Sequence, residues 1–450
     1  MAPLSLDTLP PEITYAIFTG VETFGRDFNE PRNLLSLCQT CKRLNDIATP
    51  LLVRSWASRD DKAHLKLRRF IRHLLQHPEY EMEVRHVSFH RHPFSFPKLE
   101  FSQVEKTTLK RLASESILGN DAGFVKRVGE GDGDALLALL LMRATGLEIV
   151  CLLSPTWTPV WRVLDMISQR ITDSGKSELA HDSQKLPLQC LHTADILAFD
   201  DRPMDANSYG ALFCLPRLSD VRILGGATRL DPSHSSYMPR GVSSVTSLIL
   251  SSRSKIDTEG IGRMVESCKA LKHLTIYPDF TNAELNMKKF GQRLAQAQGH
   301  ALEDLLLHDF RELGDRMWLG DALVGLKVLR RLVIQMCVLY SHQQLADSSV
   351  ALKPLLSLLP ASLKILEIAE PADGTSLHTK PRSIGLLEGY VSDLMAVGQR
   401  PALEELRLNG WYHRENSSAC LKLRQLCSEA GIYLNLTPSG ETPRRGVILM

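Results

Sequence analysis

The sequence has no hydrophobic run long enough to cross a lipid bilayer. Its strongest apolar stretch is "ALLALLLM" at residues 135–142, between Asp134 and Arg143, whereas a spanning helix needs about 20 residues. The amino terminus "MAPLSLDTLPPEI" has no basic start followed by an apolar segment, so we expect no signal peptide. We therefore expect an intracellular protein, cytoplasmic or nuclear, with no membrane contact.

The chain also lacks a strong charge of either sign. It has 53 Lys and Arg against 51 Asp and Glu, a net charge of +2 that gives no general attraction to nucleic acid. Its 9 cysteines are scattered, which is typical of free thiols in a reducing compartment. With 450 residues, 44% hydrophobic and 23% charged, the composition is that of a globular protein with about three domains.

Motifs for catalysis or cofactor binding are missing. No Gly-rich loop follows an expected strand, which argues against a nucleotide site. The acidic segment "VGEGDGD", 128–134, lacks the closing Glu of a calcium loop, and we expect a flexible solvated turn. The neighbouring histidines are spaced too loosely for a zinc site; they are His73, His77, His86, His90 and His92. We expect no enzyme activity, no cofactor and no metal.

Two helices are expected in the first fifty residues. The first starts at "LDTLPPEI" and carries an apolar stripe of Leu9, Ile13, Ile17 and Phe18. The second begins near 31–33 and should end at Pro50. Its apolar positions are spaced by three or four; they are Leu34, Leu37, Cys38, Cys41, Leu44 and Ala48. The two cysteines would then lie in mid-helix on this stripe, as small core residues rather than as a redox or zinc pair.

From about residue 218 onward a short apolar pattern recurs. Its copies are "LSDVRI" at 218, "VTSLIL" at 245, "LKHLTI" at 271, "LEDLLL" at 302, "LRRLVI" at 329, "LKILEI" at 363 and "LEELRL" at 403. Earlier segments at 84 and 147 are degenerate copies. Each copy predicts a short strand, helical periodicity lies between copies, and "IYLNL" after Gly431 predicts a last strand.

The recurring pattern resembles a leucine-rich repeat solenoid of strand-and-helix units. The expected fold is therefore α/β, with an N-terminal helical part followed by an irregular solenoid in which stacked neighbours bury one continuous core. Unequal spacing between copies keeps a doubly wound α/β domain as an alternative. The expected division is 1–56, 57–217 with degenerate repeats, 218–436 as the solenoid, and a flexible tail at 437–450.

The first 56 residues resemble an F-box, in particular its fungal form. The resemblance rests on "LPPEI" followed in order by "LLSLCQTCKRLNDIATPLLVRSW". In that family the helices bind the linker subunit of an SCF (cullin-RING) ubiquitin ligase. The resemblance implies a contact through Leu9, Pro10, Ile13, Ile17, Leu34, Leu37, Cys41, Leu44 and Leu51.

The resemblance thus implies a non-catalytic substrate receptor that reaches a cullin through the linker subunit. An unknown protein substrate would bind the outward side of the short strands. The candidate residues there are His273, Tyr277, His308, Arg331, Gln335, Arg407 and Trp411. The alternative is a repeat scaffold whose N-terminal helices only cap the solenoid, without a ligase partner.

Overall fold

A computed structural model gives the fold in two compact units. The first comprises Met1–Phe199 with Cys214–Leu218, and the second comprises Asp200–Phe213 with Ser219–Met450. The structure describes residues 9–24, 32–58, 62–89, 98–153, 163–164, 166–167, 187–197, 203–205, 210–224, 227–229, 238–251, 257–277, 285–307, 318–340, 344–345, 349–369, 380–397, 402–409 and 417–437. Each unit is considered by itself below.

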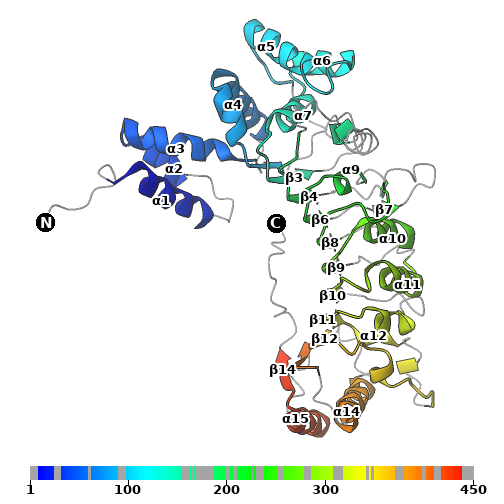
Figure 1. Cartoon of the computed structure of the whole chain (residues 1–450). Coiled ribbons are helices and arrows are strands. Elements are labelled where there is room, and N and C mark those ends of the chain that lie inside the picture. Colours follow the sequence, from blue (N-terminus) through cyan, green and yellow to red (C-terminus); the bar gives the residue numbers. More distant parts are fainter. Residues whose placement is uncertain are drawn as a thin grey trace, which may run out of the picture. The chain divides into compact units, whose positions relative to one another are not determined.

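The first unit begins with three helices around a small core. They are α1 (Pro11–Phe24), α2 (Arg32–Cys38) and α3 (Lys42–Arg54), drawn in dark blue in Figure 1. One residue of α1 and one of α2 meet three residues of α3. This cluster consists of Phe18, Leu34, Leu44, Ala48 and Leu51, each at most 5% exposed. The helical spacing in the sequence thus predicted the core-facing side of α3.

The single second helix expected from the sequence is two helices. The chain turns at Gln39 and Thr40, where the Thr40 hydroxyl donates to the carbonyl oxygen of Leu37 at 2.7 Å and satisfies the end of α2. Pro50 lies inside α3 and does not end it. The helix continues because Leu51 beyond the proline is buried, so packing outweighs the one lost N–H donor.

The remainder of the first unit alternates parallel strands with helices. Strands β1 (Ser55–Ser58), β2 (His86–Phe89), β3 (Ile149–Leu153) and β4 (Thr193–Leu197) pair in that order. Between them lie α4 (Ala63–Gln76), the 3₁₀ turn η2 (Pro78–Glu83), α5 (Gln103–Ser114), α6 (Ala122–Gly129) and α7 (Gly133–Arg143). The pattern at 84 and 147 predicted β2 and β3, while β1 and β4 have no such signal.

The acidic segment 128–134 is ordered by local bonds, so the expectation of a flexible solvated turn is wrong. The Asp132 carboxylate caps α7 by accepting from the Ala135 amide at 3.0 Å, and it pairs with Arg127 Nη2 at 3.0 Å. Gly131 has φ +80°, a conformation that glycine adopts without a steric penalty. Helix α7 follows as a wholly buried apolar segment, Ala135 to Met142.

The second unit repeats a strand and a connecting element many times. Its parallel strands are β6 (Asp220–Leu224), β8 (Ser247–Ser251), β9 (His273–Tyr277), β10 (Asp304–Leu307), β11 (Arg331–Ile334), β12 (Ile365–Ala369), β13 (Glu405–Asn409) and β14 (Tyr433–Thr437), paired in that order. A separate parallel pair joins β5 (Pro203–Asp205) to β7 (Ala227–Arg229). Every copy of the apolar pattern from 218 onward corresponds to one of these strands.

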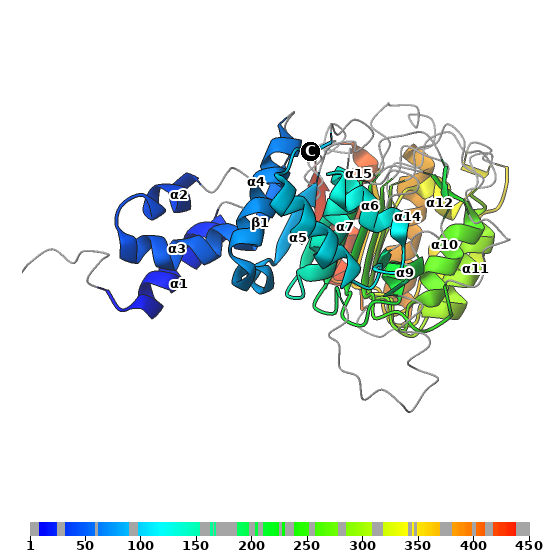
Figure 2. The same cartoon turned by 90° about the horizontal axis from the view of Figure 1, so that it is seen from above.

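The connecting elements are helices of unequal length. They are α9 (Gly210–Phe213), α10 (Thr258–Ser267), α11 (Met287–Gln298), η8 (Gly320–Gly325), α12 (Met336–Leu339), η9 (Leu355–Ser357), α14 (Lys380–Ala396) and α15 (Ser418–Ala430). Figures 1 and 2 show that α10, α11, α12 and α14 lie on one side of the strands of this unit. No helix that the structure describes in this unit lies on the other side of these strands.

The strand register places equivalent residues side by side. Leu248, Leu274 and Leu305 are successive partners, followed by Leu332, Leu366 and Leu406, and all six are fully buried toward the helices. The residues on either side of each leucine face away from the helices. This alternation is the one that the sequence pattern predicted.

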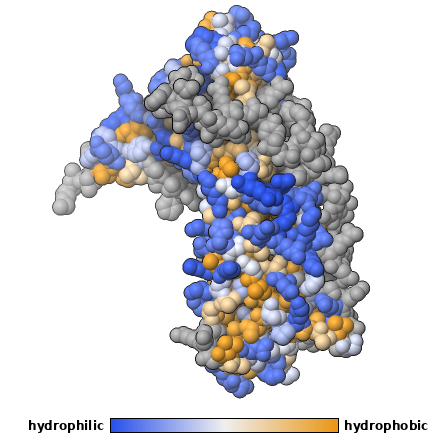
Figure 3. Space-filling view, turned by 45° about the vertical axis from the view of Figure 1, so that its right-hand side comes forward, coloured by the Kyte–Doolittle hydropathy of each residue, from blue (hydrophilic) through white to orange (hydrophobic). Residues whose placement is uncertain are grey.

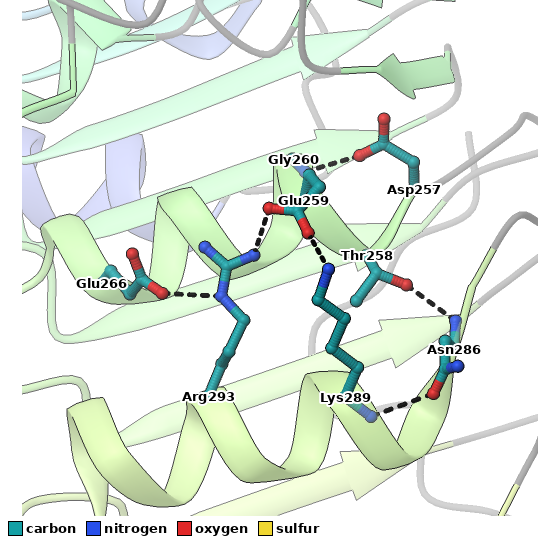
Figure 4. A network of polar contacts seen from close by, with 8 residues as sticks. All are labelled: Asp257, Thr258, Glu259, Gly260, Glu266, Asn286, Lys289 and Arg293. Atoms are coloured by element: carbon teal, nitrogen blue, oxygen red, sulfur yellow. Dashed lines mark hydrogen bonds and ion pairs between the residues drawn. The ribbon is translucent and has the colours of Figure 1, made fainter. Parts of the chain in front are cut away.

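Polar contacts join the neighbouring helices α10 and α11 (Figure 4). Arg293 of α11 donates to Glu259 at 2.7 Å and to Glu266 at 2.6 Å, both on α10. Lys289 also pairs with Glu259, and the Thr258 hydroxyl accepts from the Asn286 amide at 2.7 Å. These contacts fix one repeat against the next on the helical side.

Within the described residues, no helix is long and apolar enough to cross a membrane.

Candidate partner-binding surfaces

The first candidate surface lies on the three N-terminal helices. Ile13 and Ile17 are one turn apart on α1 and are 50% and 40% exposed, although Phe18 beside them is buried. Pro10 is exposed and Leu9 is half-buried at the start of the same helix. Figure 3 shows hydrophobic side chains at the surface of this helical part. We name Leu9, Pro10, Ile13 and Ile17 the α1 surface.

Hydrogen bonds at the first turn of α1 hold the α1 surface in place. Thr14 is fully buried, and its hydroxyl and amide both donate to the carbonyl oxygen of Pro10, at 3.1 and 3.0 Å. Arg43 of α3 donates to the carbonyl oxygen of Leu9. The first turn of α1 is therefore tied to α3 before any partner binds.

Three of the residues expected to contact a linker subunit are interior residues. Leu34, Leu44 and Leu51 are 2%, 5% and 1% exposed and belong to the helical core. The sequence predicted that they bind the linker subunit because they match positions of the F-box motif. A motif match does not say which side of each helix faces the core. They hold the α1 surface in place instead of forming it, and Leu37 is half-buried against the same core.

The two cysteines of the Cys-x-x-Cys segment have different environments. Cys38 is half-buried, with its Sγ 3.9 Å from the Thr49 hydroxyl, whereas Cys41 is exposed at the N-cap of α3. The expectation of two mid-helix core residues is wrong, because the turn at Gln39 makes Cys38 the last residue of α2 and leaves Cys41 exposed before α3. No group of three or more metal-ligating side chains forms in the part of the chain that the structure describes.

Two exposed apolar side chains near this surface were not among the candidates. Leu35 of α2 is 51% exposed and Tyr15 of α1 is 38% exposed. The guanidinium of Arg54 lies 5.6 Å from the centre of the Tyr15 ring, a cation–π contact with the last turn of α3. Leu35 follows the buried Leu34, from which it is turned by about 100° around the helix axis, and nothing in the sequence indicated that Leu35 is the exposed one of the two.

The second candidate surface is the helix-free side of the strands in the second unit. His273 on β9 is exposed, and its Nδ1 lies 2.8 Å from the Asp304 carboxylate on β10. The hydrogen bond to Asp304 raises the pKa of His273 above its ordinary value, against the opposing effect of burial. Tyr277 is half-buried at the end of β9. His308 and Trp411 lie outside the described residues.

Toward the carboxy-terminal strands this surface contains a buried carboxylate. Glu367 on β12 is 2% exposed, and its Oε2 is 3.2 Å from Arg331 Nη2 on β11 and 3.8 Å from Arg407 Nη1 on β13. Arg407 also donates to Glu405 at 2.6 Å, which lowers the pKa of that carboxyl group. Both arginines are thereby oriented along the strand surface.

The register explains why these groups meet. Glu367 and Arg407 are direct partners on β12 and β13, and Val333 is the partner of Glu367 on β11. Asn409, 8% exposed, donates its side-chain amide to Glu367 and accepts from Thr437. The alternation in the "LKILEI" copy at 363 predicts this side of the strand for Glu367, but nothing in the sequence indicates its burial.

One of the expected substrate-binding residues is not at the surface. Gln335 is 2% exposed and precedes the short helix α12, whose first residue is Met336. The alternation of strand residues does not extend to it, because β11 ends at Ile334. Arg331 and Arg407 are half-buried, with 24% and 25% of their side-chain surface exposed.

The comparisons with known proteins concern only the N-terminal helices that carry the α1 surface. No curated protein matches the chain. A family model described as F-box-like matches residues 6–55, a segment that contains the α1 surface, the helical core and the whole of the three helices α1, α2 and α3. The chain therefore carries an F-box-like domain at residues 6–55.

Proposed function

We propose that this protein is a substrate-recognition adaptor of an SCF-type ubiquitin ligase. The F-box-like domain would bind the linker subunit and through it a cullin, and the strand surface of the second unit would bind a protein substrate. The observation that carries the proposal is the match at residues 6–55 to a family whose domains bind such linker subunits. The exposed side chains of the α1 surface on a folded helical core support it.

The α1 surface has the character of a protein-binding surface. Ile13 and Ile17 leave apolar area in water that a groove on a partner would cover, and burying apolar area is the main driving force of association. The core beneath is already folded, so little ordering is needed on binding. No charged group of the α1 surface would have to be desolvated.

The proposal includes a leucine-rich-repeat-like solenoid as the substrate-binding part. Support comes from the recurring strands with one buried leucine ladder and helices on a single side. The proposal also takes the segment as the fungal form of the F-box, whose "TPLL" run is residues 49–52 of α3.

The proposed mechanism is a gain in proximity. An adaptor that holds substrate and ligase together converts a bimolecular encounter into an effectively intramolecular one. The adaptor makes or breaks no bond, so it needs no nucleophile, metal or cofactor. On the strand surface, His273, Tyr277, Arg331 and Arg407 are the candidates for contact with the substrate, with the arginines positioned by Glu367.

The test is co-purification of the full-length chain with the linker subunit. We expect a stable complex with the wild-type chain and its loss in the double variant Ile13→Asp/Ile17→Asp. The matched control is Val104→Asp, which replaces an apolar residue of α5 that is 77% exposed, outside the α1 surface. If the wild-type chain does not bind, the ligase proposal is wrong and a repeat scaffold with a helical cap replaces it.

A further inference from the structure

The last strand, β14, has one edge without a strand neighbour among the described residues. Among the strands that the structure describes, β13 is its sole neighbour, and β14 ends the order of the sheet. Leu434 and Leu436 occupy the ladder positions of Leu406 and Leu408 on β13. The two leucines of β13 are fully buried, but those of β14 are half-buried. The apolar core of the second unit is thus incompletely covered at β14.

The backbone of β14 presents hydrogen-bonding groups at this edge that have no partner among the described residues. The Tyr433 amide donates to the carbonyl oxygen of Glu404 at 2.9 Å, so the peptide groups of Tyr433, Asn435 and Thr437 face β13. Main-chain groups alternate in direction along a strand, and those of Leu434 and Leu436 therefore face the free edge. A strand placed there would find two donors and two acceptors.

The five described residues of β14 carry none of the usual protection against pairing. Natural proteins cover such edges with Lys, Pro or bulges, and the strand "YLNLT" has none of these and no charge. Repeat arrays ordinarily end in a polar capping surface. Here Tyr433 is 65% exposed, and Leu421 on the adjacent helix α15 is 49% exposed. Figure 3 shows hydrophobic side chains at the surface at this lower, carboxy-terminal end of the second unit.

We propose that β14 pairs in antiparallel orientation with β14 of a second copy of this chain, around a two-fold axis at Asn435. The strand is self-complementary in this register. Leu434 lies opposite Leu436 of the other copy, and both point their peptide groups at the partner, so each such pair exchanges two hydrogen bonds. Asn435 faces Asn435 at the axis, and Tyr433 faces Thr437.

Each of these pairs is a favourable one. Leucine opposite leucine extends the buried ladder of β13 across the axis, and an aromatic residue opposite a β-branched residue is a stabilising cross-strand pair. No like charges meet. The interface is isologous, so it closes at two chains instead of forming fibres. The proposed dimer is independent of the ligase proposal and would give an assembly with two F-box-like domains.

The decisive experiment is site-specific disulfide cross-linking of the full-length chain. At the axis the two Asn435 Cα atoms would be about 4.5 Å apart, within the range of a disulfide. Asn435→Cys should therefore give a covalent dimer under mild oxidation. Tyr433→Cys is the matched control. Tyr433 is more exposed than Asn435. In this register, however, the two residues 433, one in each copy, are offset along the strand by four residues of about 3.4 Å each, which places them about 14 Å apart.

The wild-type chain, with its 9 native cysteines, is the blank for the same oxidation. We also expect sedimentation of a two-chain species, and about a five-fold weaker dimer for Asn435→Lys, which places two ammonium groups at the axis. Equal cross-linking of both cysteine variants, or a wild-type chain that sediments as one copy at the highest concentration tested, would overturn the proposal. Linker-subunit binding by Asn435→Lys should be unchanged, which separates this test from that of the ligase role.

Discussion

Truncating the α1 surface should weaken binding of the linker subunit by about 30-fold. The perturbation is the double variant Ile13→Ala/Ile17→Ala. Ile13 is 50% exposed and Ile17 is 40% exposed, so roughly half of each side chain is left for a partner to bury. Full burial of an isoleucine contributes about 1.5–3 kcal/mol, which leaves about 1 kcal/mol per residue and about 2 kcal/mol for the pair. A free-energy loss of this size corresponds to the stated fold-change.

The assay is calorimetric titration of the purified linker subunit into the full-length chain, with thermal unfolding of each variant measured in parallel. The unfolding midpoint should change little, because neither side chain belongs to the helical core. Val104→Ala serves as the control and should bind like the wild type. A loss of less than threefold, or an equal loss in the control, would show that the α1 surface is not the contact and refute the reasoning.

Three further predictions concern stability. Leu44→Ala, which opens the helical core, should destabilise it by about 3 kcal/mol and reduce linker binding through unfolding, seen as lost helicity by circular dichroism. Glu367→Ala leaves two arginines without their buried partner and should cost about 2–3 kcal/mol in urea unfolding, against under about 0.5 kcal/mol for Glu404→Ala, whose ion pair is exposed. Burial lowers the pKa of His86 to about 4, so the unfolded chain binds a proton that the folded chain does not bind, and this group by itself lowers the stability by about 2 kcal/mol as the pH drops from 6.5 to 4. Burial, with the charge of Asp132, raises the pKa of Asp134 to about 6 and has the opposite sign, so His86→Asn should become more stable as the pH falls from 6 to 4, measured by urea titration at each pH.

The strands of the second unit were predictable because their signal is local. Each copy of the apolar pattern puts two aliphatic residues at alternate positions, and in β9 these are Leu274 and Ile276, both fully buried. The end of α15 was predictable for a similar reason. Gly431 has φ +71°, and its amide donates to the carbonyl oxygens of Cys427 and Ser428.

It was less predictable which side of each short N-terminal helix faces the core. An apolar stripe gives the period of a helix, but in a three-helix core only part of the stripe is covered. Phe18 faces the core while Ile13 and Ile17 do not, and the fully buried residue of that turn is the polar Thr14. The break between α2 and α3 was missed because the apolar spacing continues through Cys38 and Cys41 without interruption.

The candidate sites on the strands were partly predictable. The alternation of apolar and polar residues predicted that His273, Arg331 and Arg407 lie on the outward side of their strands. How far a residue on that side is buried depends on residues from neighbouring strands. Glu367 is covered by Arg331, Arg407 and Asn409. These residues come together only through the register of strands 36 to 42 residues apart in sequence.

The central claim is that the helices at residues 9–54 form a surface that a ligase linker subunit covers. Amide hydrogen exchange of the full-length chain, with and without the purified linker subunit, tests it most directly. The account predicts slower exchange in peptides from Pro11–Phe24 and Arg32–Cys38 and no change in β8 to β13. Unchanged exchange in α1 and α2 at saturating linker subunit, or protection confined to the second unit, would contradict it.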